Sequence, residues 1–187
     1  MITDRHFKSE DFEANNLPDT EFEACTFQNC NFSNCNLSGM QFAECIFENC
    51  DFTGALTGGT QLKEVSFNEC KLLGMQFSEC SDFLLQFSFK KCNLTYASFH
   101  KLKIKKTHFS NCKLEEADFS QADMESTVYD DCDLVGAIFE RTNLSKTDFR
   151  TSRYFSIDPA NNRMKGARFS LDGLPGLLVK YGLKIEV

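Results

Sequence analysis

The chain has 187 residues, of which 42% are apolar, with 20 Phe, 10 Cys, no Trp and a formal net charge of −7 at pH 7. This apolar content is enough for a folded domain, but no stretch approaches the roughly 18 apolar residues of a membrane-spanning helix. The acidic balance argues against a simple nucleic-acid-binding protein, which is normally basic. Many cysteines and an N-terminal segment, MITDRHFKSEDF, without an apolar export signal predict reduced thiols and a cytoplasmic location.

A five-residue period runs through most of the chain. Every fifth residue over 7–77 is Phe or Leu, apart from Thr57, and a second series of apolar residues runs by fives over 84–154. The step of seven between the two series places two inserted residues within 78–83. A period of five fits neither the 3.6 residues of a helix turn nor the alternation of a flat strand. The pattern therefore predicts a different geometry, in which the central residue of each unit points into the core.

A 20-residue period is superimposed on the five-residue one. Nine of the ten cysteines lie two residues before a central position, and Cys80 lies two residues before 82, the next step of the first series. Six of the ten follow one another at intervals of 20, or 22 across the insertion. These six are Cys30, Cys50, Cys70, Cys92, Cys112 and Cys132. Four five-residue sides per turn explain both periods, so that equivalent side chains of successive coils stack about 4.8 Å apart. We predict an all-β, four-sided β-helix over residues 1–156.

The residue before each central position is often Asn or Asp. Side chains of this type suit tight turns, because they accept hydrogen bonds from nearby backbone amides. We expect such bonds at Asn31, Asn36, Asp51, Asp118, Asp123 and Asp133.

Charge is distributed in bands along the sequence. The first 82 residues carry −10, and residues 83–114 contain seven Lys and no acid. Residues 115–140 contain nine acids and neither Lys nor Arg, and the last 47 residues carry +5. The nine acids are Glu115, Glu116, Asp118, Asp123, Glu125, Asp130, Asp131, Asp133 and Glu140.

Two interpretations of the nine acids remain open. In the first, they form surface ion pairs between coils, each contributing about 0–1 kcal/mol. The pairs would be Lys103 with Asp123, Lys105 with Glu125 and Lys113 with Asp133. In the second, they form a partner-binding stripe that imitates the phosphates of DNA and occupies a basic groove on another protein.

The last part of the chain, residues 157–187, departs from the strict repeat. After the Pro159 region we expect one ragged last coil and then a short helix that begins at Pro175 and ends at Gly182. An open solenoid end exposes strand edges and core side chains, so it must be capped or paired. The segment therefore serves as a cap, or as a cap that also joins two copies, through Leu177, Leu178, Tyr181 and Leu183.

The sequence gives no support for catalysis or metal binding. His6, His100 and His108 are scattered, and none of the common nucleophile, phosphate-loop or zinc-protease motifs occurs. Cysteines five apart lie on different sides of the coil, and no CxxC pair is present. We predict a protein that is not an enzyme and uses no cofactor.

Individual units identify a known repeat. Cys30-Asn31-Phe32-Ser33-Asn34, Ala117-Asp118-Phe119-Ser120-Gln121 and similar units closely resemble the pentapeptide-repeat family over about residues 5–156. This resemblance implies a right-handed quadrilateral β-helix. The short Leu-rich tail is similar to that of the topoisomerase-interacting branch, which includes the Qnr, MfpA and microcin B17 immunity types.

Membership of that branch implies a homodimeric, DNA-mimicking rod that binds DNA gyrase or topoisomerase IV and protects it from inhibitors, as in quinolone resistance. It implies no direct binding of nucleic acid or membrane. Two features depart from this pattern: the sequence shows no long inserted loop, and its last 47 residues are net basic. The alternative is a structural or scaffold pentapeptide-repeat protein that binds another protein and has no topoisomerase role.

Overall fold

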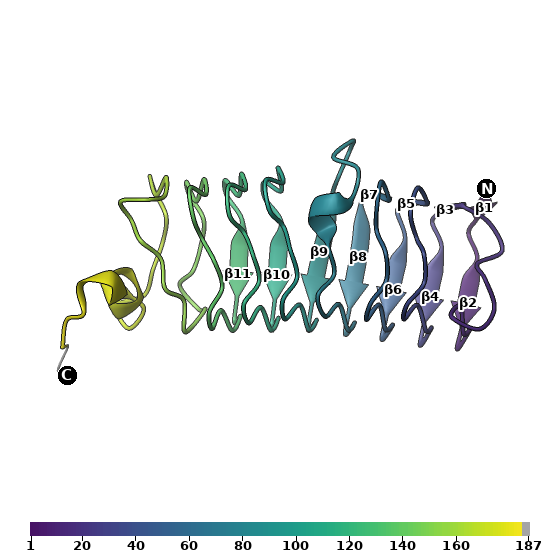
Figure 1. Ribbon diagram of the computed structural model, residues 1–187, viewed down its shortest axis with the longest axis horizontal. Helices are drawn as coiled ribbons and strands as arrows, with labels where there is room; N and C mark the ends of the chain where they lie inside the picture. The colour runs from purple at the N-terminus through teal and green to yellow at the C-terminus, as the bar shows by residue number, and fades with distance from the viewer. Residues whose placement is uncertain (185–187) are drawn as a thin grey trace.

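A computed structural model describes residues 1–184 and shows a rod of stacked coils, with residue 1 near one end and the segment after the last coil at the other (Figure 1). Its strands form two parallel sheets on two sides of the rod. One sheet contains β1 (Ile2–Thr3), β3 (Glu21–Glu23), β5 (Gln41–Ala43) and β7 (Gln61–Lys63). The other contains β2 (His6–Lys8), β4 (Thr26–Gln28), β6 (Ile46–Glu48), β8 (Val65–Asn68), β9 (Phe87–Lys90), β10 (His108–Ser110) and β11 (Val128–Asp130). The chain is a parallel β-solenoid, as the repeat predicted.

The strand register confirms the coil length. Phe7 lies opposite Phe27, and Phe27 lies opposite Phe47, which is a step of 20 residues. Between β8 and β9 the step is 22, because Phe67 lies opposite Phe89. The register returns to 20 beyond this point, so the two-residue insertion is confined to one coil.

The remaining two sides are built from tight turns joined by isolated parallel bridges, such as Asp11 with Asn31 and Asn31 with Asp51. The predicted side-chain bonds to backbone amides occur at all six Asn and Asp positions. At Asn31, for example, Oδ1 accepts the N–H of Ser33 at 3.0 Å. The polar residues of the repeat therefore hold the corners of the coil.

The central positions of the repeat form a continuous core of stacked side chains. Phe27 and Phe47 stack with ring centroids 4.9 Å apart and planes within 13°. Thr57 is the polar exception among the central positions of the first series, and its hydroxyl donates to the Gln76 carbonyl at 2.7 Å. At the N-terminal end the guanidinium of Arg5 lies 5.0 Å from the Phe7 ring centroid and covers the first ring of the column.

The second apolar series does not begin and end as the period predicts. Leu84 and Tyr154 are 58% and 65% exposed, whereas Phe87 and Phe155 are buried near these positions. The short 3-10 helix η1 (Phe77–Glu79) leads into residues 81–86, which leave the coil as a loop. Leu84 stands in this loop with a φ of 55°, so its side chain no longer follows the repeat.

Stacking continues into the predicted ragged coil, where Phe169 stacks on Phe149 with centroids 5.3 Å apart. The predicted short helix is two successive 3-10 turns, η2 (Leu174–Leu177) and η3 (Val179–Tyr181). The turns meet at Leu178, whose φ of −113° is far from the α-helical value. Gly182 ends η3 with a φ of 60°, at the residue predicted to end the helix. Among residues 1–184, no helix is long and apolar enough to cross a membrane.

Candidate protein-binding surfaces

The nine predicted acids, called here the acidic band (residues 115–140), do not share one face of the rod. Residues 115–140 are longer than one coil of 20, so the band encircles the rod. Asp118, Asp123 and Asp133 belong to three different bridge columns, and Asp130 lies in β11 on the remaining side. The structure therefore brings these acids to one level of the rod but not onto one stripe.

Basic side chains neutralise much of the acidic band. The Lys105 ammonium lies 3.2 Å from carboxylate oxygens of both Asp123 and Glu125. Lys146 approaches Glu125 to 2.9 Å from the following coil, and its hydrogen bond, with that of Lys105, holds the pKa of Glu125 below its ordinary value. These contacts support the ion-pair interpretation for this part of the band.

Of the three predicted ion pairs, only Lys105 with Glu125 forms among the described residues, because Asp123 also binds Lys105 rather than Lys103. The other two pairings are confirmed in register alone. Lys103 and Asp123 are bridge partners, as are Lys113 and Asp133. The Lys113 ammonium, however, binds Glu115 at 2.7 Å. Within residues 1–184, four acids of the band have no basic partner within 4.0 Å, namely Glu116, Asp130, Asp133 and Glu140.

A second acidic surface lies in the N-terminal half, where sequence reasoning placed no site. Asp4, Glu44 and Glu64 occupy one corner of the rod at multiples of 20 residues, with Ala24 in the coil between the first two, and all three acids are exposed. Their φ values of 51–54° show that they occupy the same turn position. None of them has an ion-pair partner among the described residues. We call this set the acidic corner; the charge of −10 in the first 82 residues and the 20-residue period could have revealed it.

The loop of residues 81–86 projects from the rod beside η1 (Figure 1). Phe83 is 65% exposed at this loop, next to the exposed Leu84. This short loop overlaps the segment, 78–83, within which the sequence predicted the two-residue insertion. Two large apolar side chains held away from the core are typical of a protein contact.

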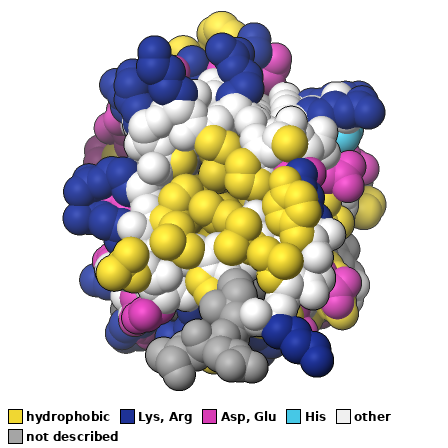
Figure 2. All heavy atoms as spheres, turned by 90° about the vertical axis from the view of Figure 1, so that its left-hand side faces the viewer, with side chains coloured by type: hydrophobic (Ala, Val, Ile, Leu, Met, Phe, Trp, Pro, Cys, Tyr) yellow, Lys and Arg dark blue, Asp and Glu magenta, His cyan; other side chains and the backbone are white. Residues whose placement is uncertain are grey.

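The C-terminal end of the rod carries an apolar surface bordered by Lys and Arg side chains (Figure 2). The exposed apolar residues in this part of the chain are Tyr154, Leu171, Leu174, Val179, Tyr181 and Leu183, and we call them the C-terminal face. Of the four predicted cap residues, Tyr181 and Leu183 are exposed, whereas Leu177 and Leu178 are half-buried. Leu177 packs against the core, so the segment contributes to capping.

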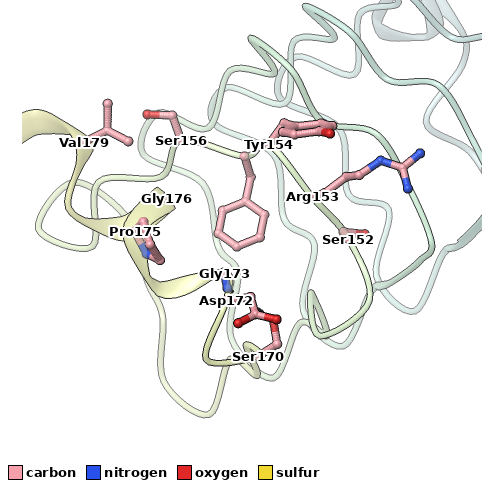
Figure 3. Close-up of a pocket in the computed structure, with 11 residues that line it drawn as sticks. Ser152, Arg153, Tyr154, Ser156, Ser170, Asp172, Gly173, Pro175, Gly176 and Val179 are labelled. Carbon is pink, nitrogen blue, oxygen red and sulfur yellow. Dashed lines mark hydrogen bonds between the residues drawn. The ribbon is translucent and has the colours of Figure 1, made fainter. Parts of the chain in front are cut away.

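A cavity of about 490 Å³ lies between the last coil and η2 (Figure 3). The side chains of Tyr154, Pro175 and Val179 supply apolar wall, and Asp172 and Arg153 supply polar groups. The cavity is large enough for one side chain of a partner and opens beside the C-terminal face.

The three histidines form no catalytic arrangement in the described part of the chain. His100 Nδ1 has no hydrogen-bond partner and lies 3.9 Å from Asp118 Oδ2, beyond hydrogen-bond distance. Among residues 1–184, no three His, Cys, Asp or Glu side chains converge on a point that could hold a metal ion. All ten cysteines are buried and free.

Comparison with solved structures shows a similar fold over nearly the whole chain. A trypsin-treated variant of QnrB1, a plasmid-mediated fluoroquinolone resistance protein, is 21% identical, with a TM-score of 0.52 and coverage of 98% of this chain and 99% of QnrB1. HetL from the cyanobacterium Nostoc sp. strain PCC 7120, a protein involved in heterocyst differentiation regulation, is 16% identical. Its TM-score is 0.63, and the match covers 92% of this chain and 88% of HetL. No curated protein sequence matches the chain.

Two family models match the sequence. Residues 41–110 match a pentapeptide repeat region. Residues 11–39, 20–56 and 112–151 match a model of eight pentapeptide repeats. These matches cover most of the solenoid, and the chain belongs to the pentapeptide-repeat family.

Proposed function

We propose that this chain is a non-enzymatic, DNA-mimicking rod that binds DNA gyrase or topoisomerase IV and protects it from inhibitors. Two copies join through their C-terminal faces, and the acidic surfaces of the two arms occupy the basic groove that otherwise holds DNA. The proposal extends the resemblance to the topoisomerase-interacting branch.

The acidic corner is the observation that carries this proposal. Glu44 and Glu64 stand one coil apart, and the stacked rings of Phe22 and Phe42 in an adjacent column give a coil spacing of 5.3 Å. Carboxylates repeated along a rod present negative charge in a line, as a DNA strand does, although the coil interval is wider than the roughly 3.4 Å per phosphate of the strand. Because these acids have no ion-pair partner, their field remains available to steer a basic surface toward the rod.

The C-terminal face supports the homodimer. Large exposed side chains such as Leu171 and Tyr181 at an open solenoid end form a patch of the kind that marks a protein contact. A twofold contact places the same patch on both subunits, so a side chain of one copy can enter the cavity beside Tyr154 of the other.

The experiment that tests the proposal is gyrase supercoiling with purified protein over a concentration series, with and without a fluoroquinolone. We expect rescue from the drug at low protein concentration. The double variant E44Q/E64Q should weaken rescue at least tenfold, whereas E125Q, which removes a neutralised acid, should change it less than twofold. Absence of rescue, of inhibition and of gyrase binding would reject the topoisomerase role.

The dimer is tested separately by light scattering coupled to size exclusion. We expect the mass of two chains for the wild type and of one chain for L171E/Y181E. Leu56 is the matched control, because it is 57% exposed on the side of the rod, and L56E should leave the mass unchanged. A wild-type mass of one chain would contradict the dimer.

One observation favours the alternative function, a scaffold whose partner is another protein. The acidic band is partly neutralised by Lys105, Lys113 and Lys146, and Phe83 offers an apolar contact on the projecting loop. For a scaffold of this type, E44Q/E64Q should have no effect on gyrase, and the partner should bind through Phe83.

A further inference from the structure

One corner of the rod carries a column of six thiols, one in each of six successive coils. We call it the thiol column: Cys30, Cys50, Cys70, Cys92, Cys112 and Cys132. Each of these side chains is at most 2% exposed and is free. Glu10 precedes the column in the first coil and Ser152 follows it in the last.

Packing alone does not require cysteine at this corner. The equivalent positions on the other corners are filled by different small or apolar residues without loss of burial. One corner contains Ala97, Ala117 and Ala137, and another contains Thr107, Thr127 and Thr147. Six successive cysteines at one corner are therefore compatible with the fold but are not required by it.

The spacing of the column suits a metal ion held between two sulfurs. Stacked ring pairs beside the column give coil spacings of 4.9 Å for Phe27–Phe47 and 5.1 Å for Phe89–Phe109. A zinc–thiolate bond is about 2.3 Å, and a linear sulfur–metal–sulfur unit with bonds of about this length spans about 4.6 Å. The Cys50 thiol donates to the Phe27 carbonyl at 3.3 Å and the Cys70 thiol to the Phe47 carbonyl at 3.4 Å, so the sulfurs hold equivalent positions in adjacent coils.

The coordination number selects the class of metal. Because no three candidate ligands converge among the described residues, a tetrahedral zinc site is not formed here. Soft monovalent cations accept two thiolates in a line, and thiolate ligands select copper(I) over hard cations. We propose that the thiol column binds monovalent soft cations of the copper(I) and silver(I) class, each between cysteines of two adjacent coils.

The binding step balances simply. Each cation forms two metal–sulfur bonds, two S–H bonds break, and both protons pass to solvent, leaving an anionic bis-thiolate without any change of oxidation state. The free thiols carry their protons, because each sulfur of the column donates a hydrogen bond to a backbone carbonyl, as Cys92 does to Phe67 at 3.3 Å. Uptake should therefore release two protons per ion.

Surface hollows give access to the column at two places. One of about 480 Å³ lies over Cys30 and Cys50, with Asp51 and Lys71 on its wall. Another of about 280 Å³ lies over Cys112. Carboxylates at these openings attract a cation, and the basic groups beside them balance the negative bis-thiolate.

Silver(I) is the probe for the test, because it does not oxidise thiols under anaerobic titration. Reduced full-length protein should bind three ions in the column, seen by native mass spectrometry, with far-UV circular dichroism unchanged and X-ray absorption showing two sulfur neighbours. The variant C50A/C92A/C132A leaves no adjacent thiols in the column and should lose all three ions. C25A/C35A/C80A removes as many thiols outside the column and should retain them.

Equal loss of ions in both triple variants would overturn the proposal, as would binding only with loss of the circular dichroism signal. If C50A/C92A/C132A fails to fold, the single variant C50A decides, because it leaves two adjacent pairs and should lose one ion. Full silver binding by a folded C50A would also reject the column as the site.

Discussion

Phe67 and Phe89 stack with ring centroids 5.3 Å apart and planes within 11°, although 22 residues separate them. The neighbouring pairs of the same column, such as Phe47 with Phe67, are 20 residues apart and stack at similar distances. The core thus continues through the insertion without a gap, and the extra residues are expelled into the loop of residues 81–86. The solenoid tolerates an insertion when it occurs at a corner and leaves the stacked column intact.

The first prediction concerns which side chain fills the core in the coil that contains the insertion. Phe87 is 4% exposed and Leu84 is 58% exposed, so Phe87→Ala should lower the free energy of unfolding by about 3–5 kcal/mol. Leu84→Ala should change it by less than about 0.5 kcal/mol. Urea unfolding followed by circular dichroism measures both. A larger loss for Leu84→Ala would show that the five-residue period continues through the loop.

The second prediction tests the inward and outward assignment in the middle of the rod. Phe109 is fully buried between Phe89 and Tyr129, so Phe109→Asp places a charge in the core and should cost more than about 4 kcal/mol. Ser110 points outward between Lys90 and Asp130 of the adjacent coils. Ser110→Asp should therefore cost less than about 1 kcal/mol, measured for both variants by urea unfolding. Equal losses would contradict the assignment.

Most of the solenoid could be predicted because every repeat carries the same pattern of inward and outward residues. The 20-residue spacing of Phe7, Phe27 and Phe47 determines which residues stack, and the register confirms it. The failures occur where the repeat is interrupted. At Leu84 and Tyr154 the period alone cannot show that a nearby ring, Phe87 or Phe155, fills the core instead.

The surfaces were harder to predict because acids that are close in sequence lie on different sides of the rod. The acidic band is continuous in sequence but encircles the rod. A long Lys side chain can also reach several carboxylates, and Lys113 pairs with Glu115 rather than with Asp133, the residue opposite it in register. The acidic corner, by contrast, is dispersed in sequence and aligned in space. Sorting acids by their position within the 20-residue coil, rather than by sequence runs, would have placed Asp4, Glu44 and Glu64 together.

The third prediction concerns the one polar side chain at a central position of the first series. Thr57 is fully buried, and its hydroxyl donates to the Gln76 carbonyl at 2.7 Å. The isosteric change Thr57→Val should lower the free energy of unfolding by about 1 kcal/mol, because this carbonyl retains a second donor, the N–H of Glu79. Thr53 is exposed, so Thr53→Val is the control and should have a smaller effect. A stabilising Thr57→Val would show that the hydrogen bond contributes nothing net.

The fourth prediction concerns the acid sensitivity of the last coils, which depends on Asp148. Hydrogen bonds from Arg150, including a side-chain contact of 2.8 Å, hold the pKa of this carboxyl below its ordinary value, and Arg168 of the next coil adds attraction at 3.3 Å. A carboxyl whose folded-state pKa is depressed contributes stability above its unfolded-state value of about 3.9, and this contribution disappears as the pH falls through the lower folded-state value.

Thermal unfolding should therefore be insensitive to this carboxylate from neutral pH down to about pH 5, and the melting temperature should fall below about pH 4. Asp148→Asn keeps an oxygen that can accept the Arg150 backbone N–H but carries no charge. We expect a lower melting temperature than wild type at pH 7 and a smaller difference at pH 3, because protonation removes the same charge from the wild type. Glu48→Gln is the control, since Glu48 makes no ion pair among the described residues. The alternative result is a difference in melting temperature between Asp148→Asn and wild type that stays constant from pH 7 to pH 3. It would show that the charge of Asp148 does not stabilise the contact between the last two coils, and that the stacking of Phe149 on Phe169 is sufficient.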